Sequence, residues 1–391
     1  MTEVSLVDNQ TFPGLLLKHS QNSADGPAFR EKYLGIWQTY SWRESAEQVR
    51  ALACGFAVMG LKRGDTIAII GDNRPQLYWV FLAAQSIGAV PVPMYQDGVA
   101  EELQYVLNHA GVRFAVVEDQ EQTDKLFLIK DRCSQLEEII YKDSRGMLDY
   151  NQPFVHNYTD VQERGRAYDE ENPNFFQREL AVTGPDDVAG VFYTSGTTGN
   201  PKGVQLTYSN LLVSANRFSH QEALQDDERQ INYAPMAWVG DHFFLALALS
   251  AGYSTNCPES RETLLTDLKE IGPTIFFGAP ALWEGLLTTI TIRMEDAGRF
   301  KRGLFRYFID VAQRAGTDLL DRRPVGLADR LRYWLGEVFV YGPLKNSLGL
   351  SHTRLAITGG APLGENTFSF YRSIGINLKQ IYGQTECSAY A

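Results

Sequence analysis

The sequence has few cysteines, and none of them stands in a paired motif. Cys54, Cys133, Cys257 and Cys387 are scattered over 391 residues without a CxxC pair. Such isolated cysteines are typical of a chain that keeps its thiols reduced in the cytosol. The six histidines form no HExxH motif, so that metalloprotease signature is missing as well.

The sequence also lacks a basic excess and a long apolar run. A formal net charge of −11 and a pI near 5.1 argue against nucleic acid as a partner, because phosphate binding needs a basic face. The start, MTEVSLVDNQTFPG, has no basic n-region and no apolar h-region of a secretory signal. The most apolar stretch, residues 243–253, is too short to cross a bilayer. We therefore expect a soluble cytoplasmic protein.

Strand-like and helix-like segments alternate along the chain. Short branched runs such as TIAII at 66–70 are followed by helical patterns such as AEELQYVLNHAG at 100–111. This alternation predicts an α/β fold with mostly parallel sheets. A polar, weakly patterned stretch at 145–185 predicts a boundary between two α/β subdomains, approximately 45–180 and 186–391.

Three well-known loop motifs are absent, yet one loop is rich in glycine and hydroxyl groups. There is no GxGxxG, no GxSxG around Ser195, and Lys202 is followed by Gly203 where a P-loop needs Ser or Thr. The segment FYTSGTTGNPKGV (192–204) lies between an apolar run and an alternating one, which favours the tip of a β-hairpin. Its backbone N–H groups, hydroxyls and lysine are suited to a polyphosphate.

The same loop resembles the signature of the adenylate-forming superfamily of acyl-CoA synthetases, luciferases and adenylation domains. Further segments resemble that superfamily in the expected order, and together they cover nearly the whole chain: YAPMAWVGDH (233–242), FFGAPALWEGL (276–286), TGGAPL (358–363) and YGQTE (382–386). The resemblance implies the fold of the large N-terminal domain of such an enzyme, here residues 1–391. It also implies that a carboxylate reacts with ATP in the presence of Mg²⁺ and then passes to the thiol of CoA.

The resemblance implies roles for particular residues. Lys202, Thr194 and Glu386 are expected to be catalytic, and Glu386 with Thr194 would hold Mg²⁺. The residues implied for nucleotide binding are Thr194, Ser195, Gly196, Thr197, Thr198, Gly199, Lys202, Gly360, Ala361, Pro362, Tyr382, Gly383, Gln384 and Thr385. Those implied near the acyl group are Trp238, Phe276, Phe277, Gly278 and Gly359. Trp238 fits either a tunnel gate or an ordinary core residue.

Within the superfamily, the insert at 299–350 and the GAPALWE segment resemble long-chain fatty acyl-CoA synthetases. A fatty acid, ATP and CoA are then the expected partners. Transfer to a carrier protein and a non-catalytic nucleotide or acyl-adenylate binder are the alternatives. The chain stops five residues after Glu386, so we expect the small C-terminal lid domain to be absent and turnover to be impaired.

One segment departs from the acidic character of the chain. Residues 299–332 contain nine Lys or Arg and four Asp, with Phe305, Phe308 and Val311 at helical spacing. This pattern predicts an amphipathic surface helix docked on the core. The alternative is a basic face that attracts an anionic partner or a membrane surface.

Overall fold

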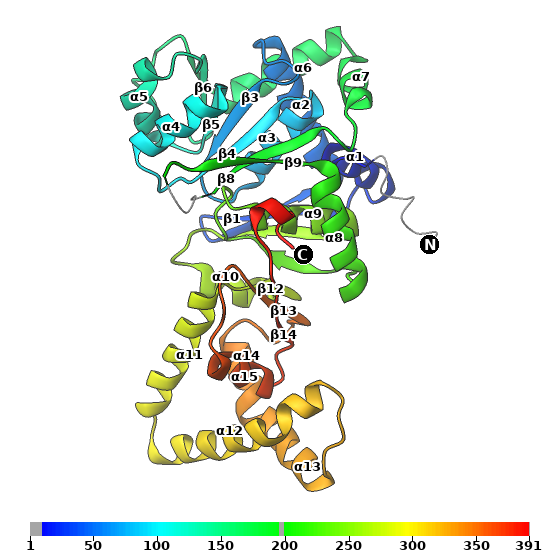
Figure 1. Ribbon diagram of the computed structural model, residues 1–391, viewed down its shortest axis with the longest axis vertical. Helices are drawn as coiled ribbons and strands as arrows, with labels where there is room; N and C mark the ends of the chain where they lie inside the picture. Colours follow the sequence, from blue (N-terminus) through cyan, green and yellow to red (C-terminus); the bar gives the residue numbers. More distant parts are fainter. Residues whose placement is uncertain (1–9, 195–198, 391) are drawn as a thin grey trace.

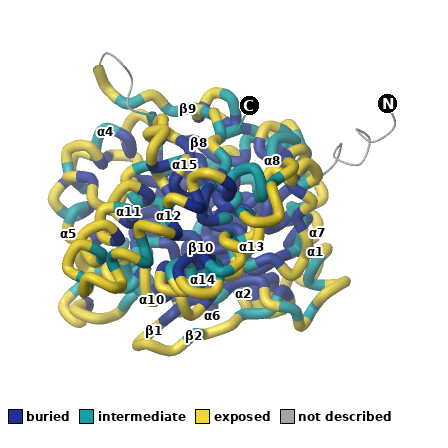
Figure 2. The backbone as a smooth tube through the Cα atoms, turned by 90° about the horizontal axis from the view of Figure 1, so that it is seen from below, coloured by how far each residue is buried: buried dark blue, intermediate teal, exposed yellow. Residues whose placement is uncertain are grey.

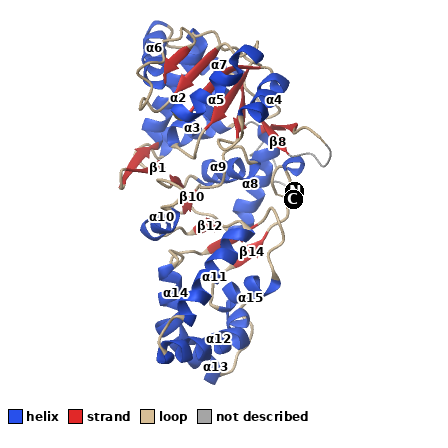
Figure 3. Ribbon diagram, turned by 90° about the vertical axis from the view of Figure 1, so that its left-hand side faces the viewer, coloured by secondary structure: helices blue, strands red, loops and turns tan. Residues whose placement is uncertain are grey.

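The computed structural model describes residues 10–194 and 199–390 and forms an elongated α/β molecule (Figure 1). The five-stranded sheet lies at one end, a seven-stranded sheet in the middle, and a group of helices at the other end (Figures 1 and 3). Buried residues follow the sheets and the helices against them, whereas exposed residues follow the outer turns (Figure 2). The predicted mixed α/β architecture is confirmed.

The five-stranded sheet is entirely parallel and has the order β4-β3-β5-β6-β7. Its strands are β3 (Thr66–Ile70), β4 (Val90–Met94), β5 (Val112–Val117), β6 (Glu138–Tyr141) and β7 (Val155–Asn157). Isoleucine and valine run through β3 and β5 without polar alternation and are buried, as expected for strands covered on both faces. The helices around it are α2 (Trp42–Val58), α3 (Pro75–Ser86), α4 (Ala100–Ala110) and α5 (Gln120–Ile129), with a 3₁₀ turn η2 (Lys130–Arg132).

The seven-stranded sheet has the order β14-β13-β12-β10-β11-β1-β2 and is parallel except for its β1–β2 pair. Its strands are β1 (Pro27–Tyr33), β2 (Ile36–Ser41), β10 (Arg229–Ile231), β11 (Ser254–Cys257), β12 (Ile275–Phe277), β13 (Leu355–Thr358) and β14 (Leu378–Gln380). The early strands β1 and β2 therefore belong to the sheet built by the later half of the chain. They follow the first helix, α1 (Phe12–Asn22).

The polar stretch around the expected boundary contains two helices, α6 (Tyr158–Glu171) and α7 (Phe175–Val182). α6 packs closely on α2, and the contact depends on small residues. A Cβ on Gly165 would overlap the carbonyl oxygen of Ala51, and one on Gly55 would overlap that of Val161. Close packing at glycines holds α6 in place where its sequence offers few large apolar side chains.

The glycine-rich loop joins β8 (Val188–Thr194) to β9 (Lys202–Thr207), which pair as an antiparallel hairpin. The predicted hairpin is therefore confirmed. Strand β9 leads directly into α8 (Tyr208–Glu222), whose capping box joins Thr207 and Asn210. β8 lies against β4, so the hairpin bridges the two large sheets (Figure 1).

The remaining helices surround the seven-stranded sheet or extend from it. They are α9 (Val239–Ala251), α10 (Leu264–Ile271), α11 (Pro280–Glu295), α12 (Arg299–Leu320), α13 (Leu327–Gly336), the π-helical η3 (Glu337–Tyr341), α14 (Gly342–Ser347), α15 (Glu365–Ser373) and the short η4 (Thr385–Cys387). The predicted amphipathic helix is present as α12, which buries Phe308 and Val311. Among the described residues, no helix combines the length and the apolar character needed to cross a membrane.

Candidate active site

A cavity of about 350 Å³ lies where the hairpin, the later sheet and α9 meet. Its lining residues come from the ends of strands and from the start of α9: Thr194, Trp238, Val239, Gly240, Phe243, Phe244, Phe277, Gly359, Gly360, Ile381, Gly383, Gln384, Thr385, Glu386 and Ala389. Strands β12, β13 and β14 are parallel neighbours, so the segments that follow them emerge at one edge. Ligands of open α/β sheets bind outside this carboxyl edge.

Glycines keep this edge open. Gly360 has a φ of +85°, a left-handed conformation that side chains with a Cβ rarely adopt. A Cβ on Gly383 would overlap the carbonyl oxygen of Ala389, so the chain passes itself there at close range. The TGG and YGQ segments can therefore approach a ligand with their backbone.

Aromatic side chains form one wall of the cavity. The Trp238 and Phe277 rings lie 5.2 Å apart between centroids, and Phe244 lies at the same distance from Phe277. The Trp238 indole rests on Gly240, where a Cβ would stand 2.5 Å from the ring. Trp238 is half-buried and directly precedes the first residue of α9. An apolar group could pack against this wall.

The hairpin brings Thr194 to the cavity and places Lys202 opposite Thr194 in the strand register. The Lys202 side chain is exposed and does not line the cavity. Ser195, Gly196, Thr197 and Thr198 lie outside the described residues. Gly199 follows them with a φ of +111° and lines a neighbouring hollow on the other side of the hairpin.

Residues near the end of the described chain bring a hydroxyl and a carboxylate side chain to the cavity. Thr385 and Glu386 lie in η4 and line the cavity together with Thr194. One carboxylate and hydroxyl oxygens suit Mg²⁺, which is typically bound through one or two carboxylates, substrate phosphates and water. No group of three metal-binding His, Cys, Asp or Glu side chains occurs in residues 10–194 and 199–390, so a full protein cage for a metal is absent there.

Other predicted nucleotide-binding residues lie beside the cavity. The Tyr382 side chain is 72% exposed, so its ring is free for stacking. Ala361 and Pro362 are also exposed and directly follow the lining residue Gly360.

Two of the residues expected near an acyl group do not line the cavity. Strand alternation turns Phe276 to the opposite face of the sheet from Phe277, where it packs on Trp283 with centroids 5.4 Å apart. Gly278 makes room for the same indole, because a Cβ there would lie 2.6 Å from Trp283 Nε1. The wall is instead completed by Phe243 and Phe244 of α9.

A buried carboxylate holds the start of α9 from behind. Asp241 is 1% exposed, and its oxygens accept hydrogen bonds from Tyr78 Oη at 2.7 Å, Asn73 Nδ2 at 3.0 Å and Asn232 Nδ2 at 3.1 Å. Burial raises the pKa of Asp241 to about 7, although these donors oppose the shift. Burial lowers the pKa of its neighbour His242 to about 3, which keeps that imidazole neutral. His242 stacks on Phe81 and contacts the Met236 carbonyl.

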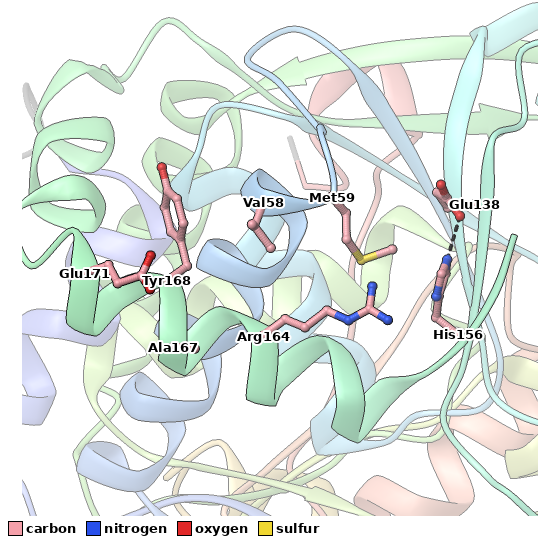
Figure 4. A pocket seen from close by; sticks show the side chains of 8 residues that line it. All are labelled: Val58, Met59, Glu138, His156, Arg164, Ala167, Tyr168 and Glu171. Atoms are coloured by element: carbon pink, nitrogen blue, oxygen red, sulfur yellow. Dashed lines mark hydrogen bonds and ion pairs between the residues drawn. The ribbon is translucent and has the colours of Figure 1, made fainter. Parts of the chain in front are cut away.

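Two further hollows do not have the character of this cavity. One of about 450 Å³ lies across the hairpin and includes Tyr105 and Tyr193. The other, of about 410 Å³, lies between α2, α6 and the β6–β7 edge (Figure 4). There Arg164 points into the space, and His156 Nε2 lies 2.6 Å from Glu138 Oε2. Neither contains the TGG or YGQTE segments.

The sequence signalled some of the lining residues that were not predicted individually. Val239 and Gly240 belong to the 233–242 segment that suggested an acyl site. Phe243 and Phe244 follow it on the next turn of α9, where their apolar character indicates only burial. Ile381 and Ala389 line the cavity because the last described segment of the chain passes beside it. No sequence pattern predicts the course of that segment.

Comparisons with known proteins identify the family of the chain. The model of the "AMP-binding enzyme" family matches residues 17–391. The chain is 26% identical over 390 residues to a mouse protein named long-chain-fatty-acid–CoA ligase ACSBG2, covering 97% of this chain and 57% of that protein. It is 27% identical over 385 residues to FadD15 of Mycobacterium bovis, with the same ligase name, covering 97% of this chain and 61% of that protein. The chain thus spans about three-fifths of the length of these relatives.

Solved structures share the fold at low identity. An anthranilate CoA ligase, AuaEII, in complex with anthranoyl-AMP superposes with a TM-score of 0.72 at 16% identity, covering 100% of this chain and 63% of that one. The N-terminal domain of FACL13 from Mycobacterium tuberculosis superposes with a TM-score of 0.68 at 19% identity. The match covers 97% of this chain and 77% of that one. The superposed fold, the cavity at the strand ends and the family match over nearly the whole sequence lead to one conclusion. The chain belongs to the AMP-binding enzyme family.

Proposed function

We propose that this chain activates a long-chain fatty acid. A fatty carboxylate attacks the α-phosphate of ATP, acyl-AMP forms and pyrophosphate leaves. The thiol of CoA then attacks the acyl carbonyl, and AMP leaves. The named relatives are long-chain-fatty-acid–CoA ligases, but this chain covers only part of their length, so the whole reaction is a proposal for the protein that carries the chain.

One observation carries the proposal. The β8–β9 hairpin, through Thr194, and the TE pair, Thr385 and Glu386, share a single cavity with an aromatic wall. Polar groups for a nucleotide therefore lie next to apolar surface for an acyl group. An acyl-adenylate has these two characters within one molecule.

The residues would act mainly by placing charge. A carboxylate approaching a polyphosphate is repelled, so the site must neutralise negative charge where it develops. Lys202 would bring a positive charge from the hairpin, and the Thr194 and Thr385 hydroxyls would donate hydrogen bonds to phosphate oxygens. Glu386 with Thr194 would hold Mg²⁺, which screens phosphate charge when bound. Tyr382 would stack on adenine, with Gly360, Ala361 and Pro362 along its edge.

The acyl chain would begin at the aromatic wall formed by Trp238 and Phe277. Burial of each methylene contributes about 0.8 kcal/mol, so a long chain gains affinity until the apolar space is full. An acyl-AMP ligase that loads a carrier protein is the second candidate, because its adenylation step is the same and only the molecule that carries the acceptor thiol differs. We also predict a cytoplasmic location and a membrane contact through residues 299–332.

Binding of stable acyl-adenylate mimics tests the proposal. Acetyl, octanoyl and palmitoyl sulfamoyladenosines would be titrated into the protein by calorimetry. We expect the affinity to rise with chain length, by roughly three orders of magnitude between acetyl and octanoyl if all six added methylenes are buried. A preference for the acetyl or an aromatic mimic would reject the long-chain assignment, and no binding of any mimic would reject adenylation. Measuring AMP release in the presence of CoA and, separately, of a carrier protein distinguishes the two ligase candidates.

A further inference from the structure

The helical end of the molecule has large apolar side chains that are exposed to solvent. Helices α12 and α13 lie at the end farthest from the five-stranded sheet (Figures 1 and 3), and Figure 2 views the molecule from this side. α12 packs its apolar side against the rest of the protein, since Phe308, Val311 and Ala312 are buried. A Cβ on Gly316 of α12 would overlap the carbonyl oxygen of Ser373 in α15, so these helices cross closely.

Helix α13 is different, because its outward side is apolar. Leu327, Leu331 and Trp334 of α13 and Val338 of the following η3 are spaced by four, three and four residues, which places them along one side of this helical segment. Their exposed fractions are 83%, 60%, 60% and 50%. We refer to these four residues as the α13 stripe.

The opposite side of α13 is anchored. Tyr333 Oη donates a hydrogen bond to the Ser373 carbonyl at 3.0 Å, and its ring packs on Tyr341 with centroids 4.9 Å apart. Gly336 is buried against the same Tyr341 side chain. The stripe is therefore held in a fixed orientation, facing away from the protein.

Two arginines that are unpaired among the described residues lie beside the stripe, although other basic side chains there pair with Asp318, Asp321, Asp329 and Glu337. Arg322, in the turn before α13, and Arg330, within it, are exposed and have no ion-pair partner in the part of the chain that the structure describes. Arg330 lines a hollow together with Trp334, and the Lys345–Glu337 ion pair lines the same hollow. This end is basic although the whole chain carries a formal charge of −11.

We infer that the α13 stripe docks on an anionic lipid bilayer. The four apolar side chains would enter the acyl boundary, and Arg322 and Arg330 would lie at the headgroup phosphates. A rigidly presented helix side with apolar residues, a tryptophan and flanking arginines has the character of an interfacial helix. The acidic remainder of the chain would be repelled by the same surface, which favours contact through this end alone.

Charge distinguishes this occupant from a second copy of the chain. A contact between two α13 stripes would place against each other two surfaces that carry Arg322 and Arg330, which are unpaired within the described chain. Like charges at a contact are unfavourable, whereas an anionic headgroup layer neutralises them. The inference does not rest on the proposed ligase activity, because vesicle binding is measured without ATP or a fatty acid.

Co-sedimentation with vesicles tests the inference. Vesicles of phosphatidylcholine alone and of phosphatidylcholine mixed with phosphatidylglycerol would be used at low and at high salt. We expect binding to the mixed vesicles that weakens as salt rises. The double variant Leu331→Asp/Trp334→Asp should lower this binding by at least about tenfold. The matched control Leu128→Asp/Leu148→Asp, which changes exposed apolar residues elsewhere, should bind as the parent does.

A second pair of variants tests the charges. Arg322→Gln/Arg330→Gln should weaken binding to the mixed vesicles, whereas Arg166→Gln/Arg217→Gln, at exposed arginines elsewhere, should not. Thermal melting of each variant establishes that it is folded. The inference is overturned by a parent chain that does not bind the mixed vesicles or by a folded Leu331→Asp/Trp334→Asp variant that binds them equally. A dimer of the parent that this variant abolishes would assign the stripe to a second copy instead.

Discussion

The carboxyl ends of the strands differ between the two large sheets, although the five-stranded sheet is parallel and the seven-stranded sheet is parallel except for its β1–β2 pair. In the five-stranded sheet, the carboxyl ends of β3 and β5 are closed by charge: Arg74 Nε donates to Glu118 Oε1 at 3.1 Å. The remaining Arg74 nitrogens donate to the Pro258 and Glu259 carbonyls of the other sheet. In the seven-stranded sheet, glycine-rich segments follow β12, β13 and β14, and the same edge holds a cavity.

This difference teaches that the side chains after the strands decide where an α/β protein has room for a ligand. Where an ion pair fills the strand ends, as Arg74 and Glu118 do, the side chains connect the two sheets and leave no room for a ligand. We call this Arg74–Glu118 contact the joint. Strand ends followed by glycine and hydroxyl residues stay open and present backbone N–H groups. The buried Asp241 lies at the seam, because its partners Asn73 and Tyr78 follow β3 while Asn232 follows β10.

The largest effect is expected at this seam. The pKa of Asp241 is about 7 in the folded chain, above its ordinary value, so the folded state holds the proton more tightly than the unfolded state. This contribution to stability is complete below pH 4 and is lost as pH rises through 7, on the order of 4 kcal/mol. Asp241→Asn should remove that pH dependence from the free energy of unfolding in urea, whereas Asp226→Asn, at an exposed site, should retain it. If the free energy of unfolding of Asp241→Asn depended on pH as that of the parent does, Asp241 would not be the group with the raised pKa.

The open strand ends are tested through their charged groups. Lys202→Ala and Glu386→Ala, in the protein that carries this chain, should each slow fatty-acid-dependent pyrophosphate release by about 10²–10³-fold. Both side chains are exposed, so thermal melting should stay near that of the parent. Exposed Lys18 and Glu365 supply matched alanine controls. Parental activity in either site variant would remove that residue from the site.

The closed strand ends are tested through Arg74. Arg74→Met removes a charged hydrogen-bond donor that joins Glu118 to the loop after β11. We expect the free energy of unfolding to fall by about 2 kcal/mol, because a charge-assisted bond is lost and Glu118 stays partly buried. Denaturation in urea measures the change, and Arg43→Met, at an exposed pair with Asp25, should cost much less. Equal costs would mean that the joint adds nothing to stability.

The smallest effect concerns the aromatic wall. Trp238→Ala removes the ring that packs between Gly240 and Phe277, so the palmitoyl-adenylate mimic should bind about tenfold more weakly. Calorimetry measures this, with Trp37→Ala as a control away from the cavity. Tighter binding after the substitution would instead identify the indole as a block to the acyl chain.

Several elements followed from local sequence. The branched apolar run at 66–70 predicted β3, the helical pattern at 100–111 predicted α4, and the alternation around the glycine-rich loop predicted the β8–β9 hairpin. These predictions were possible because burial on one or two faces leaves a period in the sequence. The helix α6 left no such signal, since its packing on α2 depends on the absence of side chains at Gly55 and Gly165.

The candidate site divides in the same way. Sequence motifs identified Thr194, Trp238, Gly360, Gly383 and Glu386, which the fold brings to one cavity. They could not distinguish Phe277, in the wall, from Phe276, which packs on Trp283 behind the sheet. Adjacent strand residues face opposite sides, and only the position of the neighbouring layers decides which side is the cavity.

The sequence by itself determined the fold class, the hairpin and the order of the family motifs, because these are recorded in local patterns of residue type. Tertiary structure alone decided that β1 and β2 join the later sheet, that Asp241 is buried among three donors, and that α13 turns an apolar stripe outward. Each of these depends on contacts between residues far apart in the chain. Such contacts are set by packing, and a single sequence contains no local signal for them.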